Sequence, residues 1–180
     1  MSLARFVSGA LWPADDVAAQ QGVEADELVA PASPSLWRSQ LNAGTLGRSI
    51  RMVISHIKEK LQKYPHVTYT TTEGHLQIPA PSPTGFRVWI HERADGCSVG
   101  FDGWHEEFTD ADEAVNCFAF GLSTACRLRV FSLGSADYKW QVLHKVDGQW
   151  VADSETSLFV FPFWRGSVQR DLQNDIISAA

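Results

Sequence analysis

Residues 85–108 constrain the fold more than any other part of the chain, because they carry the pattern of a β-hairpin. Their sequence is GFRVWIHERADGCSVGFDGWHEEF, in which apolar and polar residues alternate before and after Asp95-Gly96. Asp-Gly between two alternating runs is the strongest short-range signal for such a hairpin, since both turn residues take a positive φ. We therefore predict a two-residue turn at Asp95-Gly96, with Ile90 opposite Phe101.

This alternation divides the side chains of the hairpin between the two faces of a sheet. The apolar set predicted to face the core is Phe86, Val88, Ile90, Cys97, Val99 and Phe101. Continuing the same alternation puts Arg87, Trp89 and Trp104 on the opposite face. Since Trp and Arg often carry the binding energy of interfaces, we predict that these three residues contribute to a recognition surface. The alternative is that another element covers this face, because sheets buried on both sides lose clean alternation.

Helices and strands elsewhere follow from the spacing of apolar residues. A helix is predicted at residues 45–64, with the apolar stripe Ile50, Val53, Ile54, Ile57 and Leu61. A second is predicted at residues 111–123, with the stripe Ala111, Ala114, Val115, Phe118 and Leu122 after a capping Thr109 or Asp110. Strands are predicted at residues 67–72, 75–78, 128–133, 138–146, 150–152 and 157–163, with a second turn at Asp147-Gly148 and a tail helix at residues 167–177.

This order of elements is typical of an α+β fold. Strands that follow one another through tight turns indicate antiparallel pairing, and the helices do not alternate with strands as they would in a parallel fold. We predict an antiparallel sheet of about six to eight strands, packed by the two main helices, within a single domain of residues 45–180. Residues 1–44, punctuated by proline and glycine, are predicted to form a short helical N-terminal arm and a linker.

The net charge of −6 narrows the classes of partner. Broad nucleic-acid binding depends on a basic surface, so we expect no nucleic-acid partner. No apolar run reaches the ~18 residues of a membrane span, so no membrane partner is expected either. Cys97, Cys117 and Cys126 form no CxxC pair and are interpreted as reduced thiols, which favours a cytoplasmic location. The sequence carries no signal for an oligomeric state.

Neither a metal site nor a cofactor is expected. The histidines and cysteines lack the ligand spacing of a zinc site, and the hairpin pattern puts His91 and His105 on opposite faces. No glycine-rich phosphate-binding motif occurs, so no nucleotide cofactor is predicted. Cys126, followed by the basic Arg127, is the best candidate for a reactive thiol, but the sequence assigns it no catalytic partner.

Two classes of function stay open. The first is a non-catalytic binding or adaptor domain that recognises a protein or a small apolar ligand through Arg87, Trp89 and Trp104. The second is a small enzyme with hydrolase-like acid–base chemistry, for which Asp102, His105 and Glu107 are the candidate catalytic residues. Polar residues also gather at strand ends for turn formation alone, so binding is the preferred interpretation.

Overall fold

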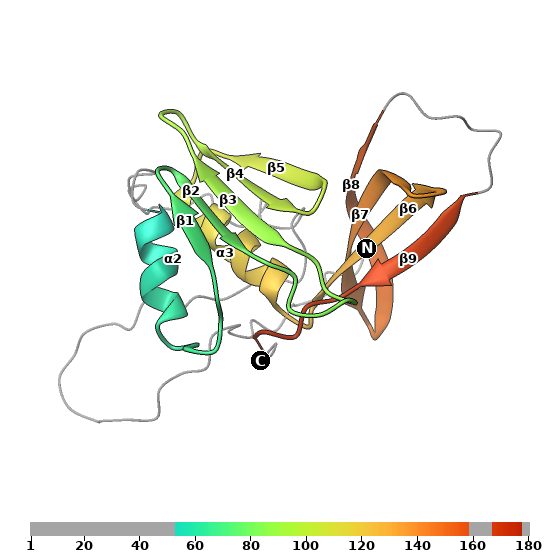
Figure 1. Ribbon diagram of the computed structural model, residues 1–180, viewed down its shortest axis with the longest axis horizontal. Helices are drawn as coiled ribbons and strands as arrows, with labels where there is room; N and C mark the ends of the chain where they lie inside the picture. The colour runs from blue at the N-terminus through green and yellow to red at the C-terminus, as the bar shows by residue number, and fades with distance from the viewer. Residues whose placement is uncertain (1–52, 159–166, 178–180) are drawn as a thin grey trace, which may run out of the picture.

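Two antiparallel sheets and two α-helices make up the part of the chain that the computed structural model describes, residues 53–158 and 167–177 (Figure 1). The first sheet has the order β1-β2-β3-β4-β5, with β1 Thr70–Thr72, β2 His75–Ile78, β3 Val88–Glu92, β4 Cys97–Phe101 and β5 Trp104–Phe108. The second has the order β8-β7-β6-β9, with β6 Cys126–Leu133, β7 Ala136–Val146, β8 Gln149–Ser157 and β9 Val168–Leu172. The predicted α+β class is confirmed, but the strands divide between two sheets. The predicted arm and linker at residues 1–44 lie outside the described residues.

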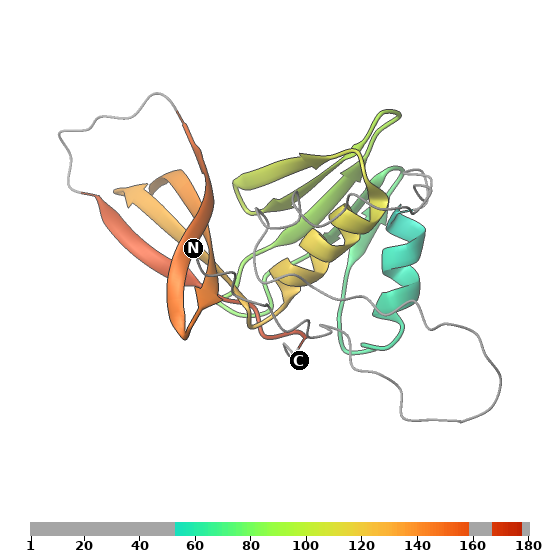
Figure 2. The same ribbon diagram turned by 180° about the vertical axis from the view of Figure 1, so that it is seen from behind.

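Both helices pack on one face of the five-stranded sheet, as the view in Figure 2 shows for α3. In α2 (Val53–Leu61) the buried residues are Val53, Ile54, Ile57 and Leu61, which are the described part of the predicted stripe. α3 (Ala111–Leu122) begins after Asp110, whose carboxylate accepts hydrogen bonds from the backbone N–H groups of Asp112 and Glu113 at 2.9 Å each. A side-chain acceptor of this kind satisfies backbone donors that the first turn leaves unpaired, so the cap fixes where α3 starts.

The core lies between the helices and this face of the sheet. All six residues predicted to face inward are buried: Phe86, Val88, Ile90, Cys97, Val99 and Phe101. Leu128, Val130 and Val142 of the four-stranded sheet belong to the same apolar cluster. The two sheets are therefore joined through one continuous apolar interior, and burial of this interior is the main stabilising contribution expected for such a fold.

The β3–β4 hairpin closes one residue earlier than the predicted Asp95-Gly96 turn. Ile90 pairs with Val99 and not with Phe101, and Gly96 does not take the positive φ that the predicted turn requires. The predicted register is therefore wrong by two residues. Because side chains alternate with a period of two, a shift of two leaves every residue of β3 and β4 on its predicted face.

A further tight turn, at Asp102-Gly103, folds β5 back along β4. Phe101 pairs directly with Trp104, their rings stack with centroids 4.8 Å apart, and Asp102 takes a φ of 49°. A two-residue turn places its flanking residues opposite each other on the same face, so the alternation restarts at Trp104. Trp104 is 1% exposed and belongs to the core. The prediction that it shares a face with Trp89 is wrong.

Strands β7 and β8 meet at Asp147-Gly148. Val146 pairs with Gln149 across these two residues, which take φ values of 49° and 80°. Positive φ at both positions is the geometry that Asp-Gly favours in a two-residue hairpin. The turn therefore allows β8 to extend over nine residues, beyond the predicted strand at 150–152.

The chain from residue 167 forms β9 and not the predicted tail helix. β9 pairs antiparallel with β6, and side chains at two neighbouring positions of β9 form ion pairs with β6 and with β7. Arg129 donates to Asp171 at 2.8 and 3.0 Å, and Arg170 donates to Asp137 at 2.8 and 2.6 Å. The helix prediction considered only local spacing, whereas these partners lie more than thirty residues away in sequence. Tertiary pairing outweighs local propensity here.

The segment after β9 connects the four-stranded sheet to the rest of the core. Asn174 is fully buried, and its side-chain amide accepts from the Phe86 N–H at 3.0 Å. The same amide donates to the carbonyl oxygens of Phe86 and Gly121 at 3.0 and 2.9 Å. One side chain thus ties together the C-terminal segment, the chain entering β3 and the end of α3. Buried polar groups that are satisfied in this way specify one arrangement of the elements they join.

We expect Asn174→Ala to lower the free energy of unfolding by about 2–4 kcal/mol, because it leaves buried backbone groups without partners. Urea denaturation monitored by circular dichroism measures this change. The matched control is Asp175→Ala at the exposed neighbouring residue, which should change stability by less than about 0.5 kcal/mol. A loss below about 1 kcal/mol in Asn174→Ala would show that the amide does not hold these elements together.

Candidate functional site

The face of the five-stranded sheet opposite α3 is turned towards the viewer in Figure 1. It carries two adjacent rows of side chains, which together we call the Trp89 face. Cross-strand pairs of an antiparallel sheet share a face, so the register assigns its members. The first row is Thr70, Gln77, Trp89, Gly100 and His105. The second row is Thr72, His75, His91, Ser98 and Glu107. Trp89 is therefore a large aromatic residue among polar neighbours and a glycine.

Trp89 lies against Gly100 of the neighbouring strand. A Cβ atom added at Gly100 would overlap the six-membered ring of the Trp89 indole. The indole Nε1–H also donates to the carbonyl oxygen of Asp102, at 3.4 Å. Glycine is used in a strand where another group must approach the backbone closely. Gly100 therefore supports one side of the half-buried indole ring and holds it along the sheet.

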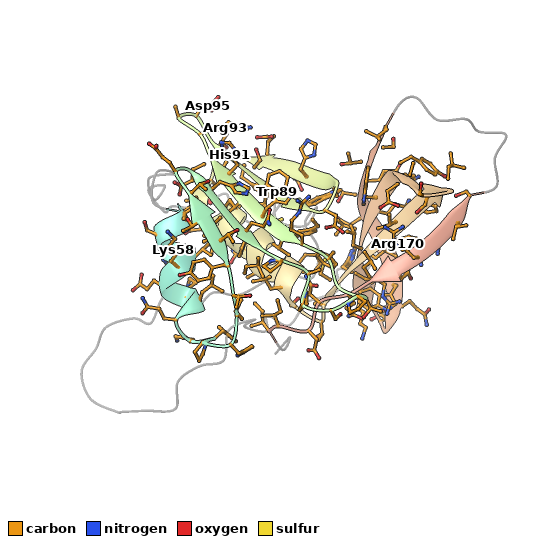
Figure 3. All side chains as sticks on the ribbon, in the orientation of Figure 1. Lys58, Trp89, His91, Arg93, Asp95 and Arg170 are labelled. Carbon is orange, nitrogen blue, oxygen red and sulfur yellow. The ribbon has the colours of Figure 1, made fainter. Side chains whose placement is uncertain are left out.

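Two histidines lie beside Trp89, and a third lies next to one of them. The His75 and His105 ring centroids are 6.3 and 6.5 Å from that of Trp89, with the planes tilted by 32° and 31°. The ring centroid of His91 lies 6.0 Å from that of His75. Figure 3 shows His91 and Trp89 along β3. Burial lowers the pKa of His75, and the nearby His91 and Arg87 lower it further. His75 therefore lies close enough to His91 and Arg87 for their charges to act on it.

Arg87 precedes β3 and lies at the edge of the Trp89 face. Within the described residues its guanidinium forms no ion pair. Its Nη2 atom makes one long hydrogen bond, 3.5 Å, to the Asp102 carbonyl oxygen. The Asp102 carboxylate instead accepts from the Arg87 backbone N–H at 3.1 Å. Burial raises the pKa of Asp102, while the hydrogen bond and charge of Arg87 act in the opposite direction. Arg87 is therefore an exposed cation beside Trp89.

The predicted cluster of Arg87, Trp89 and Trp104 is thus brought together only in part. Arg87 and Trp89 share a face and both contact the Asp102 carbonyl. Trp104 points to the other side of the sheet, under 2% exposed. His75 and Gln77 were not predicted to belong to this face, although the alternation of β2 places them next to Trp89. His105 was predicted on the opposite face, because Asp102-Gly103 was not recognised as a turn.

The candidate catalytic residues Asp102, His105 and Glu107 do not converge on one point. Asp102 lies in the β4–β5 turn, whereas His105 and Glu107 occupy different rows of the Trp89 face. The prediction that His105 points away from His91 is wrong, because the turn at Asp102 reverses the alternation. Glu107 accepts from Ser98 at 2.9 and 3.1 Å and is paired with Arg93. No observation therefore favours acid–base chemistry by these residues.

A separate group of titratable residues lies on the four-stranded sheet, and two of them, Cys126 and His144, are buried. Cys126 of β6 pairs with His144 of β7, and Asp153 of β8 lies close enough to influence both. Burial raises the pKa of Cys117 and of Cys126 well above the ordinary thiol value, so both are protonated and unreactive at neutral pH. In the described part of the chain, no three His, Cys, Asp or Glu side chains gather closely enough to hold a metal ion.

Trp150 belongs to the four-stranded sheet and is held between two cations. The Arg127 guanidinium carbon lies 4.1 Å from the ring centroid, and the Lys145 ammonium nitrogen lies 5.2 Å from it. Arg127 is also 3.5 Å from Asp171, so its charge is already paired. Trp150 is therefore part of an occupied cation–π arrangement on another sheet, and it does not extend the Trp89 face.

No known family model, curated protein or solved structure matches this chain. Among the described residues, neither helix has the length and apolar character needed to cross a membrane.

We expect Gly100→Ala to displace the Trp89 indole, because the added Cβ overlaps the ring. The Trp89 Nε1–H resonance, assigned with Trp89→Phe, should shift in ¹H–¹⁵N spectra while resonances of α3 stay in place. The ring can move towards solvent, so the loss of stability should be smaller than the ~1–3 kcal/mol of an overpacked core. An unchanged indole resonance would contradict this account of the site.

Stability should also fall at mildly acidic pH because of His144. Burial lowers the pKa of this side chain, and its Nδ1 atom makes no hydrogen bond within the described residues. The unfolded chain therefore binds the proton more readily as the pH falls through about 6.5, which favours unfolding below that pH. His144→Gln should reduce the loss of stability between about pH 7.5 and about pH 5.5, measured by urea denaturation at each pH.

The matched control for this change is His66→Gln, at an exposed histidine. Part of the pH dependence should persist in His144→Gln, because burial shifts the pKa of His75 in the same direction. If His144→Gln and the parent protein lose stability equally over this range, His144 is not the buried neutral group described here.

Proposed function

We propose that this protein is a non-catalytic binding module whose contact surface is the Trp89 face. The observation that carries the proposal is the placement of Trp89, whose indole lies against Gly100 with polar residues around it. A half-buried indole on an otherwise polar sheet face offers apolar area and a fixed orientation to a ligand. Large aromatic side chains with polar surroundings are typical of sites that recognise a flat group.

The size and composition of this face favour a small ligand over a protein partner. Protein interfaces bury about 800 Å² on each side, around a core of several apolar residues. On the Trp89 face the cross-strand neighbours of Trp89 are Gln77 and Gly100, and the residues of the second row are all polar. The apolar area that Trp89 offers is about the size of one aromatic ring, so it suits a ligand with a single ring system.

Binding without catalysis is favoured by the state of the ionisable groups nearby. Glu107 is engaged by Ser98 and Arg93, and the carboxylate of Asp102 is engaged by a backbone N–H. General acid–base catalysis requires groups that converge on a reacting atom. The groups of this face are instead distributed around an aromatic ring, where they can act as hydrogen-bond donors to a ligand.

We expect neutral aromatic probes to bind at Trp89. Indole, phenol and 2-naphthol, titrated into ¹⁵N-labelled protein, should shift the Trp89 Nε1–H and Gly100 N–H resonances, and Trp89→Ala should abolish saturable binding. Trp89→Ala should cost about 1 kcal/mol of folding free energy, against roughly 3–5 kcal/mol for truncation of the core residue Trp104. Probes that bind equally to Trp89→Ala, or a core-sized stability loss in that variant, would overturn the proposal.

A further inference from the structure

The Trp89 face combines an open ring surface with an unpaired positive charge, and this combination restricts the chemistry of a ligand. The point deepens the proposed function and rests on it. One side of the indole is filled by Gly100. The rings of His75 and His105 stand beside it, with centroids more than 6 Å away and tilted planes. Within the described residues, then, no ring is stacked on the other side of Trp89, which is available to a planar group.

Some of the charged groups around this ring form ion pairs, whereas the Arg87 guanidinium does not. Arg87 makes no ion pair with a described residue and lies near His75. Of the nearby acidic groups, Glu107 is held by Arg93 and Ser98. The Asp102 carboxylate accepts a hydrogen bond from the Arg87 backbone N–H, and its charge interacts with that of Arg87. The Arg87 guanidinium therefore remains available as a cationic donor, with the His75 and His105 rings beside Trp89, in a protein whose net charge is −6. An anion would receive charge-assisted hydrogen bonds here.

The distance between the ring and the charge sets the size of the ligand. Arg87 and His91 are each two residues from Trp89 along the same extended chain, which corresponds to about 7 Å on either side. A phosphate or carboxylate attached to a ring stacked on Trp89 therefore lies within reach of the Arg87 guanidinium. We propose that the Trp89 face binds a small planar aromatic anion, with its ring on Trp89 and its anionic group at Arg87.

A small molecule is favoured over a polyanion by the state of the other cations. Arg93 is paired with Glu107, and Arg129 and Arg170 are paired with Asp171 and Asp137. Binding of a long polyanion requires a continuous track of available positive charge. Among the arginines in the described part of the chain, only Arg87 has a guanidinium that forms no ion pair with a carboxylate.

The test compares probes that share a ring and differ in charge. Indole-3-acetate is compared with the cation tryptamine, and adenosine monophosphate with neutral adenosine, by isothermal titration calorimetry at low ionic strength. Acetate and inorganic phosphate alone show whether the anion binds without the ring. We expect each aromatic anion to bind at least about tenfold more tightly than its counterpart, which corresponds to ~1.4 kcal/mol. The relative affinities of the two anions distinguish a carboxylate from a phosphate ligand.

The variants test the contribution of the Arg87 charge separately from that of the Trp89 ring. Arg87→Gln should remove the preference for anions while weak binding of the rings persists, and Gly100→Ala should weaken all the aromatic probes. Lys58→Gln is the matched control, since it removes one positive charge from α2, on the helix side of the sheet (Figure 3). It should leave the preference intact.

The outcomes distinguish this inference from the proposed function. Equal binding of anionic and uncharged or cationic rings, lost in Trp89→Ala, overturns the inference and leaves the binding module in place. A preference for anions that survives Arg87→Gln, or disappears in Lys58→Gln, also overturns it. If the aromatic anions fail to bind while neutral indole and phenol bind, the inference fails alone. If no ring binds, both fail.

Discussion

The hydrogen bonds of Asn174 are the constraint on which the relative placement of the two sheets depends. Its amide joins the segment after β9 to Phe86, which precedes β3, and to Gly121 near the end of α3. The next residues continue this attachment, because the N–H groups of Ile176 and Ile177 donate to the Leu122 carbonyl. A chain end anchored in this way fixes β9, and β9 fixes the edge of the four-stranded sheet. Losing such an anchor leaves buried groups unpaired, which costs more than the hydrogen bonds contributed.

Aromatic rings pack closely on glycines both in the core and on the Trp89 face. Gly121 of α3 lies against Phe101, and Gly103 of the β4–β5 turn lies against Trp140 of β7, at positions where a Cβ would overlap the ring. Gly100 supports Trp89 in the same manner on the opposite face of the sheet. Since each ring fills the space a side chain would occupy, these positions cannot be enlarged without moving an aromatic group. The orientation of Trp89 is thus set by the same strand that packs against α3.

The sequence predicted the features that depend on local patterns. The Asp110 cap, the strand His75–Ile78 and the inward set of the hairpin follow from neighbouring residues alone. Features set by distant partners were missed. Alternation cannot show that β9 pairs with β6, because the Arg129–Asp171 contact spans 42 residues. The predicted face of Trp104 is wrong because the alternation alone does not reveal the turn at Asp102-Gly103. For the same reason, His105 was predicted on the face opposite Trp89.

The β3–β4 hairpin carries two separate sets of side chains, one on each face of the sheet. Val88, Ile90 and Val99 supply core packing on one side of β3 and β4, while Trp89 and His91 project from the other. Alternation keeps the two sets apart, so changes on the Trp89 face need not disturb the core. Arg87 remains exposed and without an ion pair among the described residues, although the chain has more acidic than basic side chains. An exposed cation without an ion pair adds little to stability, so the stability of the hairpin does not depend on the Arg87 charge.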